Sequence, residues 1–112
     1  MSSRVLYQDR TTALSDDALV LQGFTRILGR ARRVQLSAIA GYRVRNQSEF
    51  PNSQLPRWGL DDRGVWYTRD SRRWRRHSAI EITFHNGDVF GFSPAHPTRF
   101  AELLNELGVK AL

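Results

Sequence analysis

The chain has 112 residues, no cysteine, and 17 Lys and Arg against 11 Asp and Glu, which gives a formal net charge of +6. This length corresponds to about one domain, so we expect a single domain over residues 1–112, and the lack of cysteine excludes disulfides, thiolate metal sites and cysteine nucleophiles. No window approaches the ~18 consecutive apolar residues of a membrane span and no signal-peptide core is present, which predicts a cytoplasmic protein and leaves peripheral membrane contact open.

The first part of the chain predicts an N-terminal strand extension followed by core strands. Residues 1–13 carry a short strand candidate at Val5-Leu6-Tyr7, and Thr11 to Leu14 is a second one. After a turn at Ser15-Asp16-Asp17, the predicted elements are a strand at Ala18 to Phe24, a loop at Thr25 to Arg33, and strands at Val34 to Leu36 and Tyr42 to Arg45. In the last strand, we expect Tyr42 and Val44 to face the core and Arg43 and Arg45 the solvent.

The middle of the chain predicts two loops around two short strands. Residues 46–56 hold two prolines and little periodicity, which predicts the longest loop. Trp58 to Leu60 and Val65 to Thr68 are the strands, and we interpret their tryptophans as packing residues. Arg69 to His77 is a second basic loop.

The stretch from Ser78 to Ser93 predicts a hairpin in which side-chain parity fixes the turn. A two-residue loop at Asn86-Gly87 would place Phe90 and Phe92 on the solvent face, opposite Thr83 and Glu81. A three-residue loop, His85 to Gly87, with Gly87 in a left-handed bulge, pairs Phe90 with Ile82 and Phe92 with Ile80 instead. We therefore predict the bulged turn.

A C-terminal helix is predicted over 97–107. Pro97 suits a first helical turn, large apolar residues recur at the helical period, and Gly108 follows as a stop signal. One face of this helix must lie on the sheet. The chain as a whole therefore predicts a mainly β domain of about seven antiparallel strands, a barrel or sandwich with one C-terminal helix.

The order of several short stretches resembles the bacterial pleckstrin-homology-like (PH-like) domains. The matching features are Leu14 to Asp17, Val34 to Ile39, Trp58 to Leu60, Ile80 to Phe84 with its Asn86-Gly87 turn, Phe92-Ser93-Pro94, and the helix from Phe100 to Leu107. The resemblance implies a seven-stranded antiparallel barrel with the helix closing one end, and it carries over no catalytic residues. Members often have a pair of transmembrane helices ahead of the domain. This sequence shows none, so a membrane role cannot be carried over from the family.

Sixteen of the 17 basic residues are arginine, the residue best suited to bidentate contact with phosphates. If the strands form a meander, the loops at 25–33, 46–56 and 69–77 emerge at one rim. The first of these loops, with its neighbours, is where PH domains in general bind anionic headgroups. The predicted anion-binding residues are Arg26, Arg30, Arg32, Arg33, Arg69, Arg72, Arg73, Trp74, Arg75 and Arg76.

These residues favour a non-catalytic binding module, and its partner stays open. An anionic membrane surface or an acidic protein would meet the positive rim, and Trp74 suits a membrane interface. Nucleic acid is the alternative, because Trp74 could stack on an unpaired base between arginine–phosphate contacts. A structural or homo-oligomeric role and a merely solvated arginine surface are the remaining interpretations.

No residue pattern predicts an enzyme or a cofactor. His77, His85 and His96 lie singly, without metal-ligand spacing. The two Asp-Asp pairs, at 16–17 and 61–62, are best interpreted as turn formers, because neither has a nucleophile or base in its motif. We therefore expect no catalytic residues, no metal and no cofactor.

Overall fold

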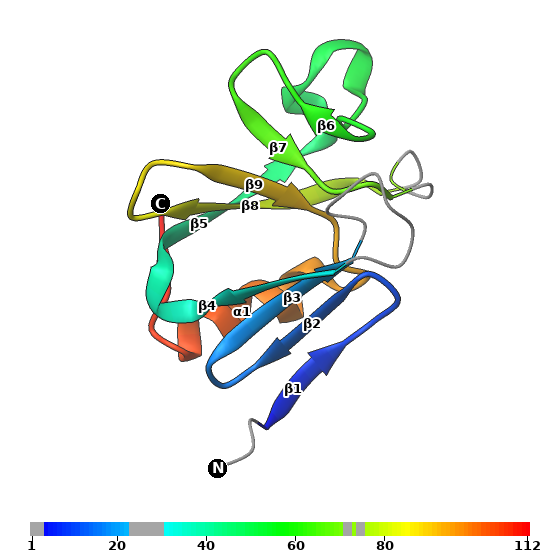
Figure 1. Cartoon of the computed structure of the whole chain (residues 1–112). Helices are drawn as coiled ribbons and strands as arrows, with labels where there is room; N and C mark the ends of the chain where they lie inside the picture. The colour runs from blue at the N-terminus through cyan, green and yellow to red at the C-terminus, as the bar shows by residue number, and fades with distance from the viewer. Residues whose placement is uncertain (1–3, 23–30, 71–72, 74–75) are drawn as a thin grey trace.

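The computed structural model describes residues 4–22, 31–70, 73 and 76–112, which form two β-sheets and one helix (Figure 1). The first sheet contains β1 (Val5–Gln8), β2 (Thr12–Ser15), β3 (Ala18–Gln22) and β4 (Ala31–Gln35). The second contains β5 (Ile39–Asn46), β6 (Gly59–Leu60), β7 (Val65–Tyr67), β8 (Ser78–Phe84), β9 (Val89–Phe92) and β10 (Lys110–Ala111). The helix α1 spans Pro97–Glu106, and short 3-10 turns lie at Leu36–Ala38, Gln47–Glu49 and Pro51–Ser53.

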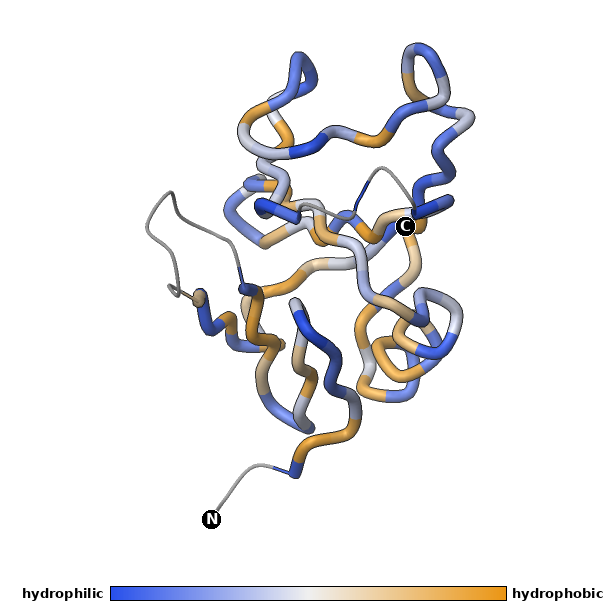
Figure 2. Tube along the Cα trace, turned by 90° about the vertical axis from the view of Figure 1, so that its right-hand side faces the viewer, coloured by the Kyte–Doolittle hydropathy of each residue, from blue (hydrophilic) through white to orange (hydrophobic). Residues whose placement is uncertain are grey.

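The first sheet is an antiparallel meander in the order β1-β2-β3-β4. Alternate side chains along a strand point to the same face, and those on the inner face of this sheet are mostly apolar. Leu14, Leu19 and Leu21 lie on this face and have no exposed surface. Figure 2 shows apolar stretches of the chain (orange) separated by hydrophilic ones (blue). Strand β4 begins at Ala31, so Arg32 and Arg33 belong to a strand and not to the predicted loop.

The second sheet is mixed, with the order β10-β5-β8-β9-β7-β6. Strand β7 pairs in parallel with β9, and β10 pairs in parallel with β5. The prediction of a closed antiparallel barrel with meander connectivity is therefore wrong: among the described residues the two sheets stay separate, and β9 lies between β7 and β8. The coarser prediction of a mainly β fold with one C-terminal helix is confirmed.

The β8–β9 hairpin has the predicted bulged turn. Ile80 pairs with Phe92 and Ile82 with Phe90, while the Phe84 N–H donates to the Asp88 carbonyl at 2.8 Å across a three-residue loop. Gly87 has φ +95°, in the left-handed region that favours glycine. Parity in the sequence thus predicted both the register and the turn.

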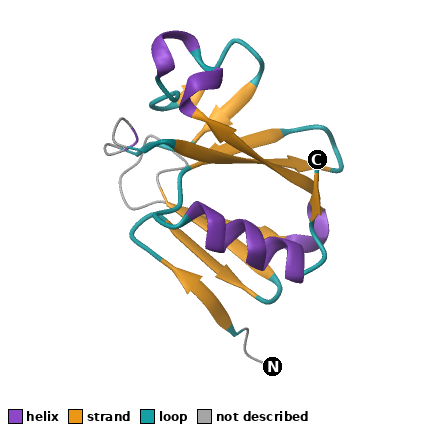
Figure 3. Ribbon diagram, turned by 180° about the vertical axis from the view of Figure 1, so that it is seen from behind, coloured by secondary structure: helices purple, strands orange, loops and turns teal. Residues whose placement is uncertain are grey.

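The main core lies where α1 meets the inner faces of both sheets. Phe100, Leu103 and Leu104 are buried on one side of α1, which packs against β8 and β5. Figure 3 shows α1 lying across one open side between the two sheets. The helix begins at Pro97 as predicted, and Gly108 follows its last turn with φ +88°.

A second, smaller core lies on the other face of the second sheet. Leu55, from the long connection between β5 and β6, packs there with Val65, Tyr67 and Ala79. Two exposure predictions for the second sheet are wrong: Val44, which pairs with Ile80 on the main-core face, is 46% exposed, and Glu81, which was expected in solvent, is 4% exposed. Within the described residues, no helix is long and apolar enough to cross a membrane.

Candidate anion-binding site

Arg73 is a structural residue that is bonded to the backbone of the candidate site and is 1% exposed. Its Nε donates to Ser93 Oγ at 2.9 Å, and its Nη2 donates to Thr68 Oγ1 at 2.8 Å. Its Nη1 donates to the carbonyl oxygens of Pro56, Arg57 and Thr68. One guanidinium group therefore ties the Pro56–Arg57 segment to the end of β7 and to Ser93 after β9.

The surroundings of Arg73 remove it from the predicted set of ligand-binding residues. Its guanidinium lies 5.3 Å from the centre of the Tyr67 ring, and burial lowers the pKa of Arg73 to about 10, against the opposing attraction of Asp70. It stays charged at neutral pH, but its donors face protein acceptors. Arg73 can position a ligand-binding surface without contacting the ligand.

Three other arginines converge on a pocket next to Arg73, which we call the arginine pocket. Arg57, Arg69 and Arg76 come from two segments that are more than ten residues apart in the sequence, and they border a cavity of about 590 Å³. Arg57 and Arg69 are exposed and Arg76 is half-buried. The other lining residues are Gln47, Ser53, Gln54, Leu55, Trp58 and Asp70.

The three guanidinium groups form no ion pair with any described carboxylate. The Nε of Arg76 is buried and has no hydrogen-bond partner within the described residues. A buried donor without a partner costs about 1–3 kcal/mol. Asp70 is buried at the same pocket and contributes the opposing charge.

An exposed aromatic side chain lines the arginine pocket, and an exposed leucine follows it in the chain. Trp58 lines the pocket and is 38% exposed, and its ring meets that of Trp66 edge-on at 6.3 Å. Leu60, two residues further along the chain, is 68% exposed. Arginines beside a partly exposed indole and an exposed leucine form a surface suited to the boundary between water and lipid headgroups.

The predicted arginines that the structure describes do not share one rim. Arg69 and Arg76 line the arginine pocket. Arg73 is buried and is not a lining residue, and Arg32 and Arg33 border a separate groove that has no lining residue in common with the pocket. The remaining predicted site residues lie outside the described ranges: Arg26, Arg30, Arg72, Trp74 and Arg75.

A second charged cluster surrounds Glu81 on the outer face of the second sheet. Its carboxylate accepts from Arg63 Nη2 at 2.6 Å and Arg45 Nε at 3.2 Å, and it also accepts a hydrogen bond from the Tyr67 hydroxyl. Burial and that hydrogen bond raise the pKa of Tyr67 well above its usual value. Burial opposes the charge on Arg63, but the hydrogen bonds to Glu81 and Asp61 outweigh it and raise the Arg63 pKa.

The two oxygens of the Glu81 carboxylate accept four hydrogen bonds from Arg45, Arg63 and Tyr67, so this cluster stabilises the sheet. No group of three or more His, Asp or Glu among the described residues could hold a metal ion. Comparisons with protein-family models, curated proteins and solved structures found no match to this chain. The site must therefore be interpreted from its own chemistry.

The sequence analysis missed two residues of the site. Arg57 was left unassigned, and Trp58 was interpreted as a packing residue, although it is partly exposed beside the pocket. The signal was present, because an arginine and a tryptophan adjoin each other directly after Pro56, at the end of a loop. The segment was overlooked because it carries one arginine, whereas Arg69 to His77 carries five.

Proposed function

We propose that the chain is a non-catalytic binding module that docks on an anionic membrane surface through the arginine pocket. The proposal rests on one observation: Arg57, Arg69 and Arg76 converge without ion-pair partners among the described residues, beside the exposed Trp58. Phosphate headgroups would be the anions that the guanidinium groups contact. Trp58 and Leu60 would enter the interfacial region.

The arginines of the pocket supply part of the docking energy. Each arginine near an anionic bilayer surface contributes about 1 kcal/mol, so the three arginines of the pocket contribute about 3 kcal/mol. The formal net charge of +6 adds long-range attraction that falls off as salt is added. Docking would therefore be transient and sensitive to ionic strength.

The PH-like relationship belongs to the same proposal. A run of strands before the single α-helix supports the resemblance, and strand β10 after the helix departs from it. The absence of a closed barrel in the described residues and the parallel β7–β9 pair are departures from it. An acidic protein surface would satisfy the same arginines, so the experiment must separate lipid from protein.

Vesicle co-sedimentation with increasing phosphatidylserine tests the proposal. Neutralising two exposed pocket residues, Arg57→Gln with Arg69→Gln, should weaken binding about 30-fold at low salt, from about 1 kcal/mol for each charge. The matched control, Arg4→Gln with Arg99→Gln, removes the same charge from exposed positions outside the pocket. Equal losses in the two double variants would contradict the proposal, because net charge alone would then explain binding.

Leu60→Ser separates a lipid surface from other anions. Leu60 is 68% exposed, so this change should leave the fold intact. It should weaken vesicle binding and leave the binding of a soluble inositol polyphosphate unchanged. If vesicles do not bind but a single-stranded oligonucleotide does, with a steep salt dependence, the nucleic-acid alternative replaces the membrane.

A further inference from the structure

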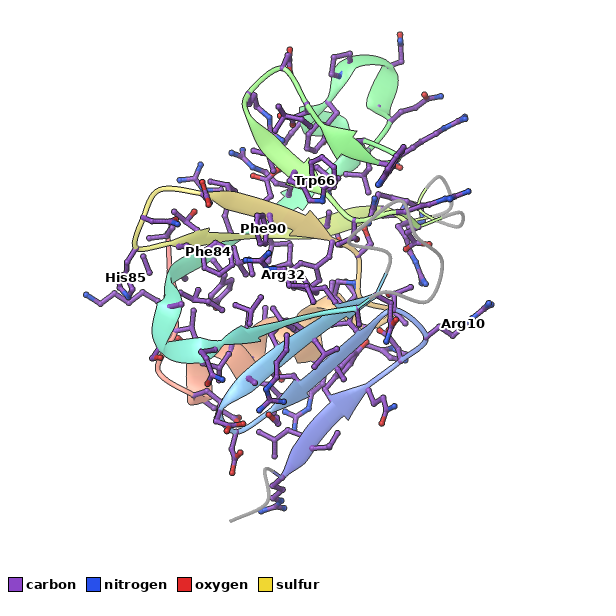
Figure 4. All side chains as sticks on the ribbon, viewed as in Figure 1. Arg10, Arg32, Trp66, Phe84, His85 and Phe90 are labelled. Carbon is purple, nitrogen blue, oxygen red and sulfur yellow. The ribbon has the colours of Figure 1, made fainter. Side chains whose placement is uncertain are left out.

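A groove separates strand β4 of the first sheet from the β8–β9 hairpin of the second. It shares no lining residue with the arginine pocket. Its volume is about 390 Å³, and Arg32, Val34, Phe84, His85 and Phe90 are among its lining residues. Figure 4 shows the Phe84 and Phe90 side chains on the hairpin side and Arg32 reaching toward them from β4. The helix α1 lies behind this side of the molecule, as Figures 1 and 3 show together.

The groove is closed at one end and aromatic along its floor. The His85 N–H donates to the Ala38 carbonyl at 3.0 Å, which joins the hairpin turn to the corner between β4 and β5. The Phe84 and Phe90 rings meet edge-on with centres 4.7 Å apart, and the Arg32 guanidinium lies 5.4 Å from the centre of the Phe90 ring. Both rings are half-buried, so part of each contacts the groove.

Among the described strands, none pairs with the edge of β4 that faces this groove. Strand β4 is the last strand of its sheet and pairs with β3 alone among the described strands. The Gln22 N–H donates to the Thr11 carbonyl on the β2 side. Because the direction of backbone hydrogen bonds alternates along a strand, the backbone N–H and C=O groups of Leu19 and Leu21 point toward β4. The backbone groups of their partners Val34 and Arg32 therefore point toward β3. Those of Arg33 and Gln35 point outward, away from β3.

An edge of this kind can accept another strand, and charge selects which one. The five residues of β4 span about 16 Å in extended form, long enough for a short peptide. A second copy of this chain would bring arginines of two β4 strands against each other, and like charges on paired strands are destabilising. An acidic strand would instead set carboxylates beside Arg33, which is exposed and meets Asp17 at 3.6 Å.

We propose that β4 binds an extended acidic segment of a partner protein as an additional strand, with apolar side chains of that segment on Phe84 and Phe90. Residues of one parity in the segment face the aromatic floor, and those of the other parity lie beside Arg33. Main-chain hydrogen bonds to Arg33 and Gln35 supply affinity, and alternating side chains supply specificity. This activity is separate from membrane docking by the arginine pocket.

The experiment uses a short synthetic peptide in which glutamate and valine alternate, measured by fluorescence anisotropy with the full chain. Gln35 has φ −72°, which proline adopts without strain, so Gln35→Pro removes an outward N–H and leaves the β3–β4 pairing in place. We expect Gln35→Pro to weaken peptide binding about tenfold or more, while the matched control Gln35→Ala keeps it. In the wild-type chain, bound peptide should slow hydrogen exchange at the Arg33 and Gln35 amides.

Charge reversal tests the selection of an acidic partner. Arg33→Glu should weaken binding about tenfold, whereas Arg10→Glu, at a residue that projects away from the groove in Figure 4, should not. Arg57→Gln with Arg69→Gln should leave peptide binding unchanged, which separates this proposal from membrane docking. Equal affinity of Gln35→Pro and wild type would overturn it, and so would concentration-dependent dimerisation that Gln35→Pro abolishes, because the edge would then bind a second copy.

Discussion

Replacing Arg73 by methionine should destabilise the fold more than any other single arginine substitution at the candidate site. Methionine fills much of the volume of the arginine stem but donates no hydrogen bonds. It therefore leaves without a donor the carbonyl groups of Pro56, Arg57 and Thr68 and the hydroxyl groups of Thr68 and Ser93. A stranded buried acceptor costs about 1–3 kcal/mol. Pro56 and Arg57 are the more exposed acceptors and can turn to water, so the Thr68 carbonyl dominates and the expected loss is about 2–4 kcal/mol.

Guanidinium chloride unfolding followed by tryptophan fluorescence measures this loss. A domain of this size has about 5–15 kcal/mol of stability in total, so the shift in midpoint should be large. Arg69→Met is the matched control: it removes an exposed arginine and should change the free energy of unfolding by less than about 0.5 kcal/mol. Arg73→Lys should fall between them, because three ammonium donors cannot reach all five acceptors. A loss below about 1 kcal/mol for Arg73→Met would refute the structural role assigned to this residue.

Three further predictions concern the rest of the fold. Gly91→Ala should cost about 1–3 kcal/mol or more in unfolding free energy, because the new Cβ would lie 2.5 Å from the buried Tyr67 ring. Glu81→Gln should cost about 3 kcal/mol by calorimetry, since it leaves two arginines facing a neutral amide. Burial opposes ionisation of Asp9, but hydrogen bonds from Tyr7 and backbone N–H groups hold its pKa below the usual value. A carboxylate with a depressed pKa stabilises the fold above about pH 4, and this stabilisation is lost as the pH falls through the pKa of the folded state. Denaturant midpoints should therefore drop in acid, and they should drop less in Asp9→Asn.

The sequence pattern predicts correctly those elements in which one face is buried and neighbouring residues fix the turn or the start of the element. The β8–β9 hairpin is the clearest case, because parity leaves one register in which Ile80, Ile82, Phe90 and Phe92 share a face. The start of α1 at Pro97 follows from the fixed φ of proline in the same way. Both inferences use interactions between residues that are near in the sequence.

Strand partners and buried charges depend on residues that are distant in the sequence. Nothing in Val65–Tyr67 indicates that it pairs in parallel with β9 and not with β8, which follows it in the chain. Glu81 occupies a position of solvent parity, yet the β5–β6 connection and Arg63 cover that face and bury the carboxylate. Alternation predicts which face a residue occupies, and it does not predict what covers that face.

The arginines show why charge density alone could not define the site. Within one basic loop, Arg69 and Arg76 line an open pocket, whereas Arg73 is consumed by five internal hydrogen bonds. The guanidinium donors that suit a phosphate also suit a set of backbone carbonyl groups that have no other hydrogen-bond donor. What decides between the two roles is whether backbone acceptors from Pro56 and Arg57 close over the side chain, and that requires a contact between segments about 17 residues apart. Arg73 therefore connects fold and site: it holds Arg57 at the pocket, so Arg73→Met should weaken anion binding although Arg73 itself contacts no ligand.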